Sequence, residues 1–290
     1  MLTYFQAIVI GLIQGVTELF PISSLGHSVL LPSLFGWHGV VTAQAQPESY
    51  FLAFLVGLHV ATALTLLWFY RRQWIAIAKG FLSSLRKRKV ETASERLAWL
   101  LIIATIPAGL VGLALEHPLR VIFAKPLSAA IFLVLNGLIL LYGQRLRNRT
   151  ARERRDYSLA ATNTNLATMS YGRGLFIGLA QTFSLLAGIS LSGITMVGGL
   201  MDGLDNEDAA RFSFLLATPI ILAAGVYKLP DLLGPNGDGV RSQALAGSLA
   251  AALAAYVAVR FLDRYFKSKN LKPFAFYCIA FGLLMVAVVH

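Results

Sequence analysis

The sequence predicts an all-α polytopic membrane protein built as an inverted repeat, in which one re-entrant helical hairpin plus three transmembrane helices occurs twice. Hydrophobic residues make up 57% of the 290 residues. Charged residues make up only 13%, well below the roughly 25% that is usual in a soluble domain. Six long apolar runs alternate with basic clusters, and one polar motif precedes each set of three runs.

Each apolar run approaches the roughly 20 residues that an α-helix needs to cross the hydrocarbon core. The expected spans cover about residues 50–70, 97–115, 127–142, 212–228, 244–262 and 273–289. Basic residues gather in the connections Arg71–Arg96, Arg145–Arg155 and Arg260–Lys272. Because short basic loops remain in the cytoplasm, we expect both chain ends to lie outside.

The two segments that remain, 1–37 and 174–204, must each begin and end on one side of the membrane. A re-entrant hairpin of two short helices is the simplest solution, provided that protein or a water-filled cavity surrounds its irregular backbone. The predicted organisation is therefore a first repeat over 1–144, a mobile cytoplasmic linker over 145–173 and a second repeat over 174–290. Inverted repeats with broken helices bind substrate where the breaks meet.

The polar motif lies inside these two hairpins. It reads I-G-L-I-Q-G-V-T-E-L-F-P-I-S-S-L-G-H at Ile10–His27 and I-G-L-A-Q-T-F-S-L-L-A-G-I-S-L-S-G-I at Ile177–Ile194, with eight identical positions. Each copy combines an amide, a helix break and a serine/glycine turn. Polar groups are costly in lipid, so their concentration predicts a functional site.

The first copy places several reactive groups close together. Gln14 and Glu18 are four residues apart and share one helix face. The proline that follows ends this helix, and Ser23 or Ser24 can cap the next one. His27 lies three residues beyond Ser24. An exposed helix N-terminus favours an anion, so an anionic lipid headgroup fits this site.

Several chemical roles are open to these side chains. Glu18 could act as a general base, orient His27 or hold a divalent cation such as Mg²⁺ or Ca²⁺. Ser24 or His27 could be the nucleophile toward phosphorus. Purely structural roles are the alternatives: Glu18 could pair with Gln14, and His27 could be a buried core histidine. His59, inside the first span, could line the same cavity or be buried for packing.

The second copy resembles a small phosphate-binding turn. Gly188 and Gly193 allow close backbone approach, and the hydroxyls of Ser190, Ser192 and Thr195 can donate to a phosphate. Small residues are also common where membrane helices touch, so helix packing is the alternative interpretation.

The net charge of +11 does not indicate a nucleic-acid partner. No Lys or Arg occurs before Arg71, and the basic residues that follow lie in loops rather than on one folded face. The expected partners are the membrane and a lipid substrate, and the sequence leaves homo-oligomerisation open.

The chain resembles the undecaprenyl-diphosphate phosphatase family, the bacitracin-resistance membrane phosphatases of bacteria, over nearly its whole length. Gln14–His27 is similar to the family's first signature, and Ala209–Pro219 is similar to another family segment. The resemblance implies that the protein hydrolyses undecaprenyl diphosphate to undecaprenyl phosphate and inorganic phosphate, which recycles the cell-wall carrier lipid. It implies a bacterial inner-membrane protein whose site opens to the outer, periplasmic side, with Glu18, Ser24 and His27 performing the chemistry and Gln14 and Ser23 binding substrate.

The second signature departs from the family pattern P-G-x-S-R-S-G-x-T. Leu191 stands at the arginine position, and a leucine cannot form the two-pronged contact of arginine with phosphate. Lys228, a divalent cation or protonated His27 could supply the missing charge. The alternative function is a non-catalytic or weakly active paralogue that binds or flips polyprenyl phosphate.

Overall fold

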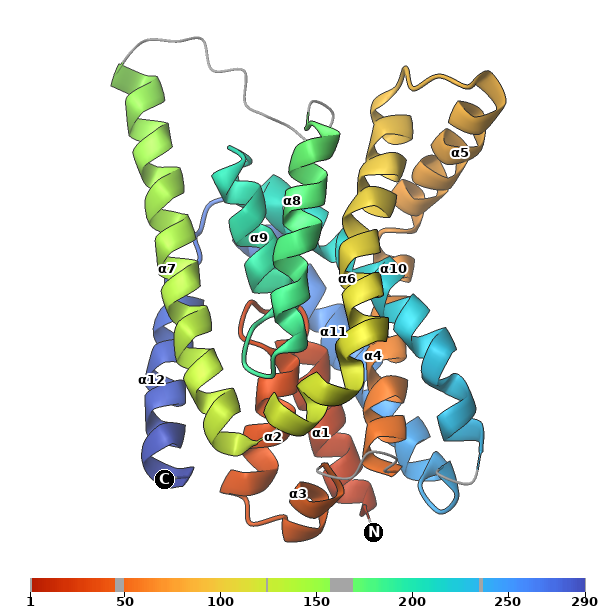
Figure 1. The fold of residues 1–290 in the computed structure, drawn as a ribbon, viewed down its shortest axis with the longest axis vertical. Helices are drawn as coiled ribbons and strands as arrows, with labels where there is room; N and C mark the ends of the chain where they lie inside the picture. The colour runs from red at the N-terminus through yellow and green to blue at the C-terminus, as the bar shows by residue number, and fades with distance from the viewer. Residues whose placement is uncertain (1, 45–49, 124, 157–168, 235–236, 290) are drawn as a thin grey trace.

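The computed structural model describes residues 2–44, 50–123, 125–156, 169–234 and 237–289, and the regular secondary structure of these residues is all helix (Figure 1). The helices are α1 (Tyr4–Thr17), α2 (Ser24–Leu34), α3 (His38–Gln44), α4 (Tyr50–Phe69), α5 (Arg71–Lys87), α6 (Ala93–Phe123), α7 (Pro126–Asp156), α8 (Tyr171–Gln181), the 3₁₀ helix η1 (Thr182–Leu185), α9 (Leu191–Met201), α10 (Asn206–Leu233), α11 (Arg241–Tyr265) and α12 (Lys272–Val289).

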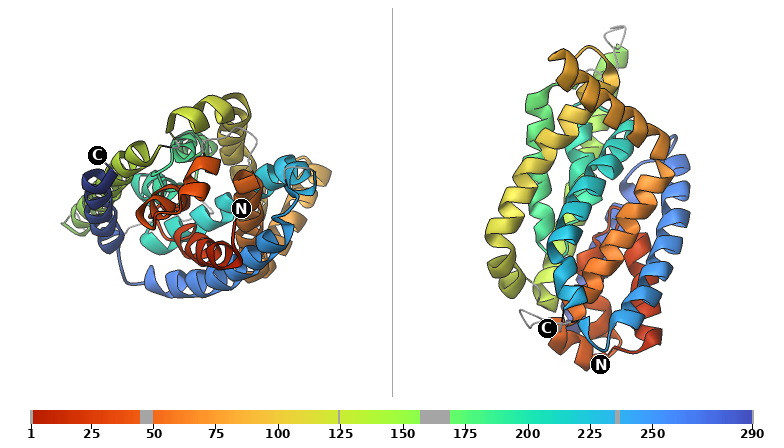
Figure 2. Two further views of the ribbon diagram at one scale, coloured as in Figure 1. Left: turned by 90° about the horizontal axis from the view of Figure 1, so that it is seen from below. Right: turned by 90° about the vertical axis from the view of Figure 1, so that its right-hand side faces the viewer.

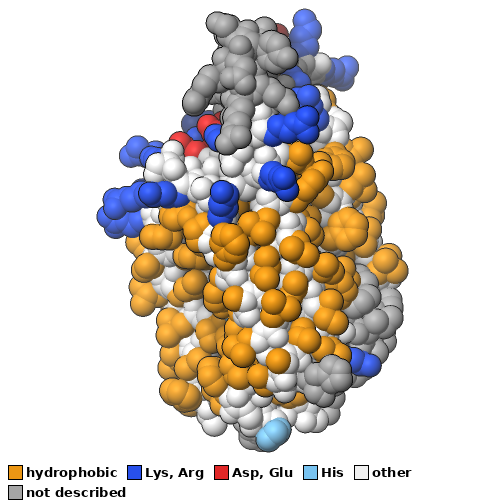
Figure 3. All heavy atoms as spheres, turned by 90° about the vertical axis from the view of Figure 1, so that its left-hand side faces the viewer, with side chains coloured by type: hydrophobic (Ala, Val, Ile, Leu, Met, Phe, Trp, Pro, Cys, Tyr) orange, Lys and Arg blue, Asp and Glu red, His pale blue; other side chains and the backbone are white. Residues whose placement is uncertain are grey.

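Six of these helices are long and apolar enough to cross a membrane, which confirms the predicted multi-pass class. Within the described residues the spans are Tyr50–Phe69, Ala93–Leu115, Pro126–Arg149, Asn206–Lys228, Arg241–Tyr265 and Lys272–Val289. Figure 3 shows a broad band of hydrophobic side chains with Lys and Arg gathered at one end. The exposed apolar residues of this band face the lipid tails, because a bilayer has no water to penalise them.

Two basic connections are more helical than the sequence analysis expected. Residues 71–87 form helix α5, and α7 continues to Asp156, so residues 145–156 of the expected mobile linker are helical. Residues 157–168 of that linker lie outside the described residues. The physical reason is that Arg, Lys, Leu and Ala are strong helix formers, so a charged helix can extend beyond the membrane. Gly80 also packs α5 closely on the backbone of Ser94 and Glu95 at the start of α6.

Each polar segment forms two short helices separated by an irregular stretch. In the first, α1 ends at Thr17 and α2 begins at Ser24. In the second, α8 ends at Gln181 and α9 begins at Leu191. The two breaks end in the same way, because a serine caps the helix that follows each of them. Ser23 accepts from the Gly26 N–H, and Ser190 accepts from the Gly193 N–H.

The packing of the two halves is similar. Helix α1 packs on α11 and α8 packs on α6, while α4 packs on α10 and α7 on α12. Figure 2 shows the short helices lying among the long ones when the molecule is viewed along its long axis. In both motif copies, the glycine at the second motif position makes this packing contact. A Cβ on Gly11 would lie 2.2 Å from the Gly247 carbonyl oxygen, and one on Gly178 would lie 2.3 Å from that of Ala104.

We therefore expect Gly11→Ala to destabilise the protein by about 1–3 kcal/mol, because α1 must move away from α11 to admit a methyl group. Thermal unfolding in detergent would measure the effect. Gly172→Ala is the matched control, since no atom lies within 4 Å of a Cβ at that helical position. The control is expected to be neutral or slightly stabilising. Equal unfolding temperatures for Gly11→Ala and the unsubstituted protein would contradict the close contact.

Candidate active site

A cavity of about 470 Å³ lies beside the two helix breaks. Its walls come from the first break and the start of α2, from α4, α6 and α10, and from the segment between the end of α8 and the start of α9. Most of the wall is apolar, and Glu18, Ser24 and His59 are among its polar residues. A cavity with a mainly apolar wall and a few polar groups suits a ligand that carries a polar head and an apolar tail.

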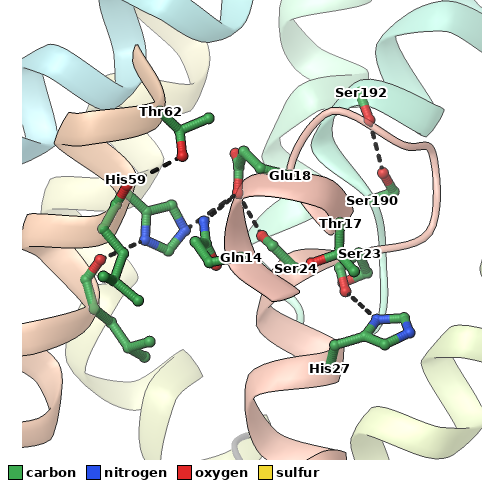
Figure 4. Close-up of polar contacts among 12 residues, drawn as sticks. Gln14, Thr17, Glu18, Ser23, Ser24, His27, His59, Thr62, Ser190 and Ser192 are labelled. Carbon is green, nitrogen blue, oxygen red and sulfur yellow. Dashed lines mark hydrogen bonds and ion pairs between the residues drawn. The ribbon is translucent and has the colours of Figure 1, made fainter. Parts of the chain in front are cut away.

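Glu18 is the centre of the polar contacts (Figure 4). Its Oε2 accepts from Gln14 Nε2 at 2.8 Å and from the hydroxyl of Ser24. The same oxygen lies 3.3 Å from His59 Nε2. The Glu18 side chain is only 4% exposed, and a charge at this depth is costly unless donors surround it. The three contacts supply that compensation and hold Glu18 in one position.

The contacts of His59 place a proton between the imidazole and Glu18. Its Nδ1 lies 2.8 Å from the Leu55 carbonyl oxygen. A carbonyl can only accept, so Nδ1 carries a hydrogen. Nε2 then faces Glu18, and two acceptors would repel each other. One proton must therefore lie on Nε2 or on the carboxyl oxygen, and His59 and Glu18 share it.

His27 lies apart from this cluster. Its Nδ1 is 2.7 Å from the Ser23 carbonyl oxygen and its Nε2 is 2.8 Å from the Tyr277 hydroxyl. The ring stacks on Tyr277 and Phe281 of α12. His27 is not among the residues that line the cavity. Figure 4 shows the ring pointing away from Glu18. Both ring nitrogens thus have partners, the Ser23 carbonyl in the first break and the Tyr277 hydroxyl of α12, and neither partner is Glu18.

The N-termini of α2 and α9 both reach the cavity wall. Ser24 and Leu25 of α2 line the cavity, as do Ser190 and Leu191 at the start of α9. The unpaired N–H groups and the dipole at a helix N-terminus favour an anion. Two such ends at one cavity create positive potential without a cationic side chain.

The two breaks are joined directly by hydrogen bonds. Ser23 Oγ accepts from the Gly188 N–H at 3.2 Å, and the Ser192 hydroxyl donates to the Phe20 carbonyl at 3.2 Å. Gly188 has a φ of +110°, and a Cβ there would lie 2.4 Å from the Ala129 carbonyl oxygen of α7. Ser23 and Gly188 therefore fix the backbone at the junction of the two breaks.

Asn136 of α7, which the sequence motifs do not include, also joins the two breaks. Its Nδ2 donates to the Pro21 carbonyl at 3.0 Å, and its Oδ1 accepts from the Ser190 N–H at 2.9 Å. The side chain is fully buried. The sequence does contain an indication of this role, since Asn136 is a single amide inside an otherwise apolar span. A polar group at that depth needs a partner.

We expect Asn136→Leu to lower the free energy of unfolding by about 2 kcal/mol or more. It removes the acceptor of the buried Ser190 N–H and leaves the Pro21 carbonyl with only the weak thiol donor of Cys278. The thermal unfolding temperature in detergent would report this loss. Asn148→Leu, near the basic end of α7, is a suitable control, since Asn148 pairs with Gln144 on its own helix. If both variants unfold at the same temperature, Asn136 does not stabilise the junction.

The structure separates the second copy's predicted residues into two groups. Ser190 and Leu191 line the cavity, as does Lys228 of α10. The lining does not include Gly188, Ser192, Gly193 or Thr195. Thr195 instead contacts the Ser213 hydroxyl at 2.6 Å, inside the helix packing. Leu191, at the position of the family arginine, thus contributes an apolar surface to the cavity.

The residues around the cavity offer few ligands for a metal ion. Among the described residues no group of three or more His, Cys, Asp or Glu side chains could hold one. Glu18 and His59 are the residues of these types that line the cavity, and one oxygen of Glu18 already has three contacts. A divalent cation here would need phosphate oxygens of the substrate to complete its coordination.

Comparison with known proteins identifies similar sequences along nearly the whole chain. The family model described as bacitracin resistance protein BacA matches residues 7–284. A protein of Frankia alni named undecaprenyl-diphosphatase 2 is 50% identical, covering 98% of this chain and 97% of its own length. A protein of Mycolicibacterium paratuberculosis named undecaprenyl-diphosphatase is 53% identical, covering 97% of this chain and 95% of its own.

Proposed function

The chain belongs to the bacitracin resistance protein BacA family, and from this membership we infer that it is an undecaprenyl-diphosphatase. The reaction converts undecaprenyl diphosphate and water to undecaprenyl phosphate and inorganic phosphate. The observation that carries the site assignment is the buried contact of Ser24 and His59 with one oxygen of Glu18 at the wall of a mainly apolar cavity. No finding favours the alternative of a paralogue that only binds or flips the lipid.

We propose Ser24 as the nucleophile and Glu18 as its general base. The Ser24 Oγ bonds to the terminal phosphorus while its proton passes to Glu18, and the bond from that phosphorus to the bridging oxygen breaks. Undecaprenyl phosphate leaves with the electron pair of that bond. Water then replaces Ser24 at phosphorus, which regenerates the hydroxyl and yields hydrogen phosphate. Ser24 is preferred over His27 because only Ser24 contacts Glu18 and lines the cavity.

The charge of the diphosphate has several sources of compensation in this chain. The N-termini of α2 and α9 face the cavity, and each favours phosphate oxygens. Lys228 and His59 also line it. Because the transition state spreads negative charge over the terminal oxygens, these groups would stabilise it without the arginine that Leu191 replaces.

The apolar part of the cavity can hold the section of the lipid tail next to the diphosphate. The lining residues of α4 and α10 fall between Leu52 and His59 and between Ile220 and Lys228. By the charge pattern these are the outer halves of the spans, because the basic connections lie at the other end. We therefore propose that the cavity opens to the periplasmic side of the bacterial inner membrane.

We also propose that the two polar segments are re-entrant hairpins of an inverted repeat. The breaks at residues 18–23 and 186–190 meet each other inside the protein, where the surrounding helices can satisfy irregular backbone. The equivalent packing of α1 on α11 and α8 on α6 supports the same division.

Growth of a bacterium depleted of its own undecaprenyl-diphosphatases tests the function in cells. Expression of this protein should restore growth, because it returns the carrier lipid to its monophosphate form. Ser24→Ala, present in the membrane at the same level, should not restore growth. Failure of the unsubstituted protein, or rescue by Ser24→Ala equal to it, would contradict the proposal.

A further inference from the structure

Gln181 occupies the position in the second motif copy that Gln14 occupies in the first. Both are glutamines near the end of the first helix of a polar segment, and both are fully buried. Gln14 donates to Glu18 at 2.8 Å. The second copy has Leu185 where the first has Glu18. Gln181 has therefore kept its amide without the carboxylate that its counterpart binds.

Both polar atoms of the Gln181 side chain lack a partner among the described residues. A buried amide without hydrogen bonds costs free energy, and an apolar side chain of similar shape would avoid that cost. Unpaired polar groups in a folded protein therefore call for a functional explanation.

The position of Gln181 supplies that explanation. Gln181 belongs to the wall of the same cavity as Glu18, Ser24 and His59. The facing wall from α6 has small residues at Gly109 and Gly112, and a Cβ added at either would have no neighbour nearer than 3.9 Å. The α6 wall thus leaves room for a ligand in the cavity that Gln181 lines.

We propose that Gln181 binds a phosphate oxygen of the lipid diphosphate through its Nε2–H. This inference rests on the proposed function, since it assigns a ligand contact within that site. In the first repeat the glutamine positions the base, and in the second repeat its counterpart holds the substrate. The Nε2–H donor of Gln181 adds to the N–H groups of the two helix N-termini. The side chain of Leu191 offers no hydrogen-bond donor to the same cavity.

Steady-state hydrolysis by purified Gln181→Met, Gln181→Glu and unsubstituted protein tests the proposal. We expect Gln181→Met to raise KM by about 10- to 100-fold, the effect of losing one hydrogen bond to a charged group, with a smaller change in kcat. Gln181→Glu should raise KM further, because a carboxylate repels phosphate. The dissociation constant of a farnesyl methylenediphosphonate, which resists hydrolysis, should rise in parallel.

Thermal unfolding separates this role from a structural one. Gln181→Met should unfold at the same temperature as the unsubstituted protein or higher, because it removes an unpaired polar group. Gln14→Met, the matched variant in the first repeat, should lower kcat because it removes a donor to Glu18. An unchanged KM in Gln181→Met, or a lower unfolding temperature, would overturn the inference. Lack of hydrolysis by the unsubstituted protein would instead refute the proposed function.

Discussion

Glu18→Gln is expected to lower kcat for phosphate release by about 10²–10⁴-fold, the usual contribution of a positioned general base. The substitution keeps the size of the side chain but removes the negative charge of the carboxylate. That carboxylate accepts hydrogen bonds from Gln14 and Ser24 and pairs with His59. Ser24 then has no group to take its proton when it attacks phosphorus. Single-turnover phosphate release with excess enzyme would measure the chemical step.

Glu91→Gln provides the control for Glu18→Gln. Glu91 is an exposed carboxylate before α6, and it pairs with Lys87 at 3.5 Å on the surface, where ion pairs contribute little. We expect its kcat to be unchanged. A Glu18→Gln variant that folds normally and keeps more than a tenth of the kcat would show that Glu18 is not the base.

Ser24→Ala is expected to lower kcat by at least about 10⁴-fold. Without the nucleophile, only substrate binding and electrostatic stabilisation of the transition state still accelerate the reaction. The variant should still bind the lipid diphosphate, because the N-termini of α2 and α9 remain in place. Ser33→Ala, later on α2, should retain full activity. Acid-quenched enzyme examined by mass spectrometry would carry phosphate on Ser24 and not on His27. Normal turnover by Ser24→Ala would exclude the proposed nucleophile.

Much of the fold was predictable because length and composition determine membrane spans. The run at residues 50–70 became α4 (Tyr50–Phe69), nearly as expected. Apolar length could not predict where α7 ends, because its last turns are charged and helix propensity continues beyond the lipid. Helix α5 was missed for the same reason, since its charged residues suggested a loop.

The candidate site was predictable to the extent that helix geometry controls it. A spacing of four residues placed Gln14 beside Glu18, and the structure contains that hydrogen bond. Spacing could not show which way His27 points, because the break turns α2 and brings its ring to Tyr277 of α12. It could not pair His59 with Glu18 either, since that contact depends on how α4 packs against the first break.

Phosphate release from undecaprenyl diphosphate by the purified protein in detergent, with Mg²⁺ or Ca²⁺ supplied, measures whether the residues around Glu18 hydrolyse the lipid. We predict that inorganic phosphate and undecaprenyl phosphate form in equal amounts over many turnovers. Glu18→Gln and Ser24→Ala, prepared in the same way, should release almost none. If folded, unsubstituted protein binds the lipid but releases no phosphate, the cluster around Glu18 does not hydrolyse the lipid diphosphate.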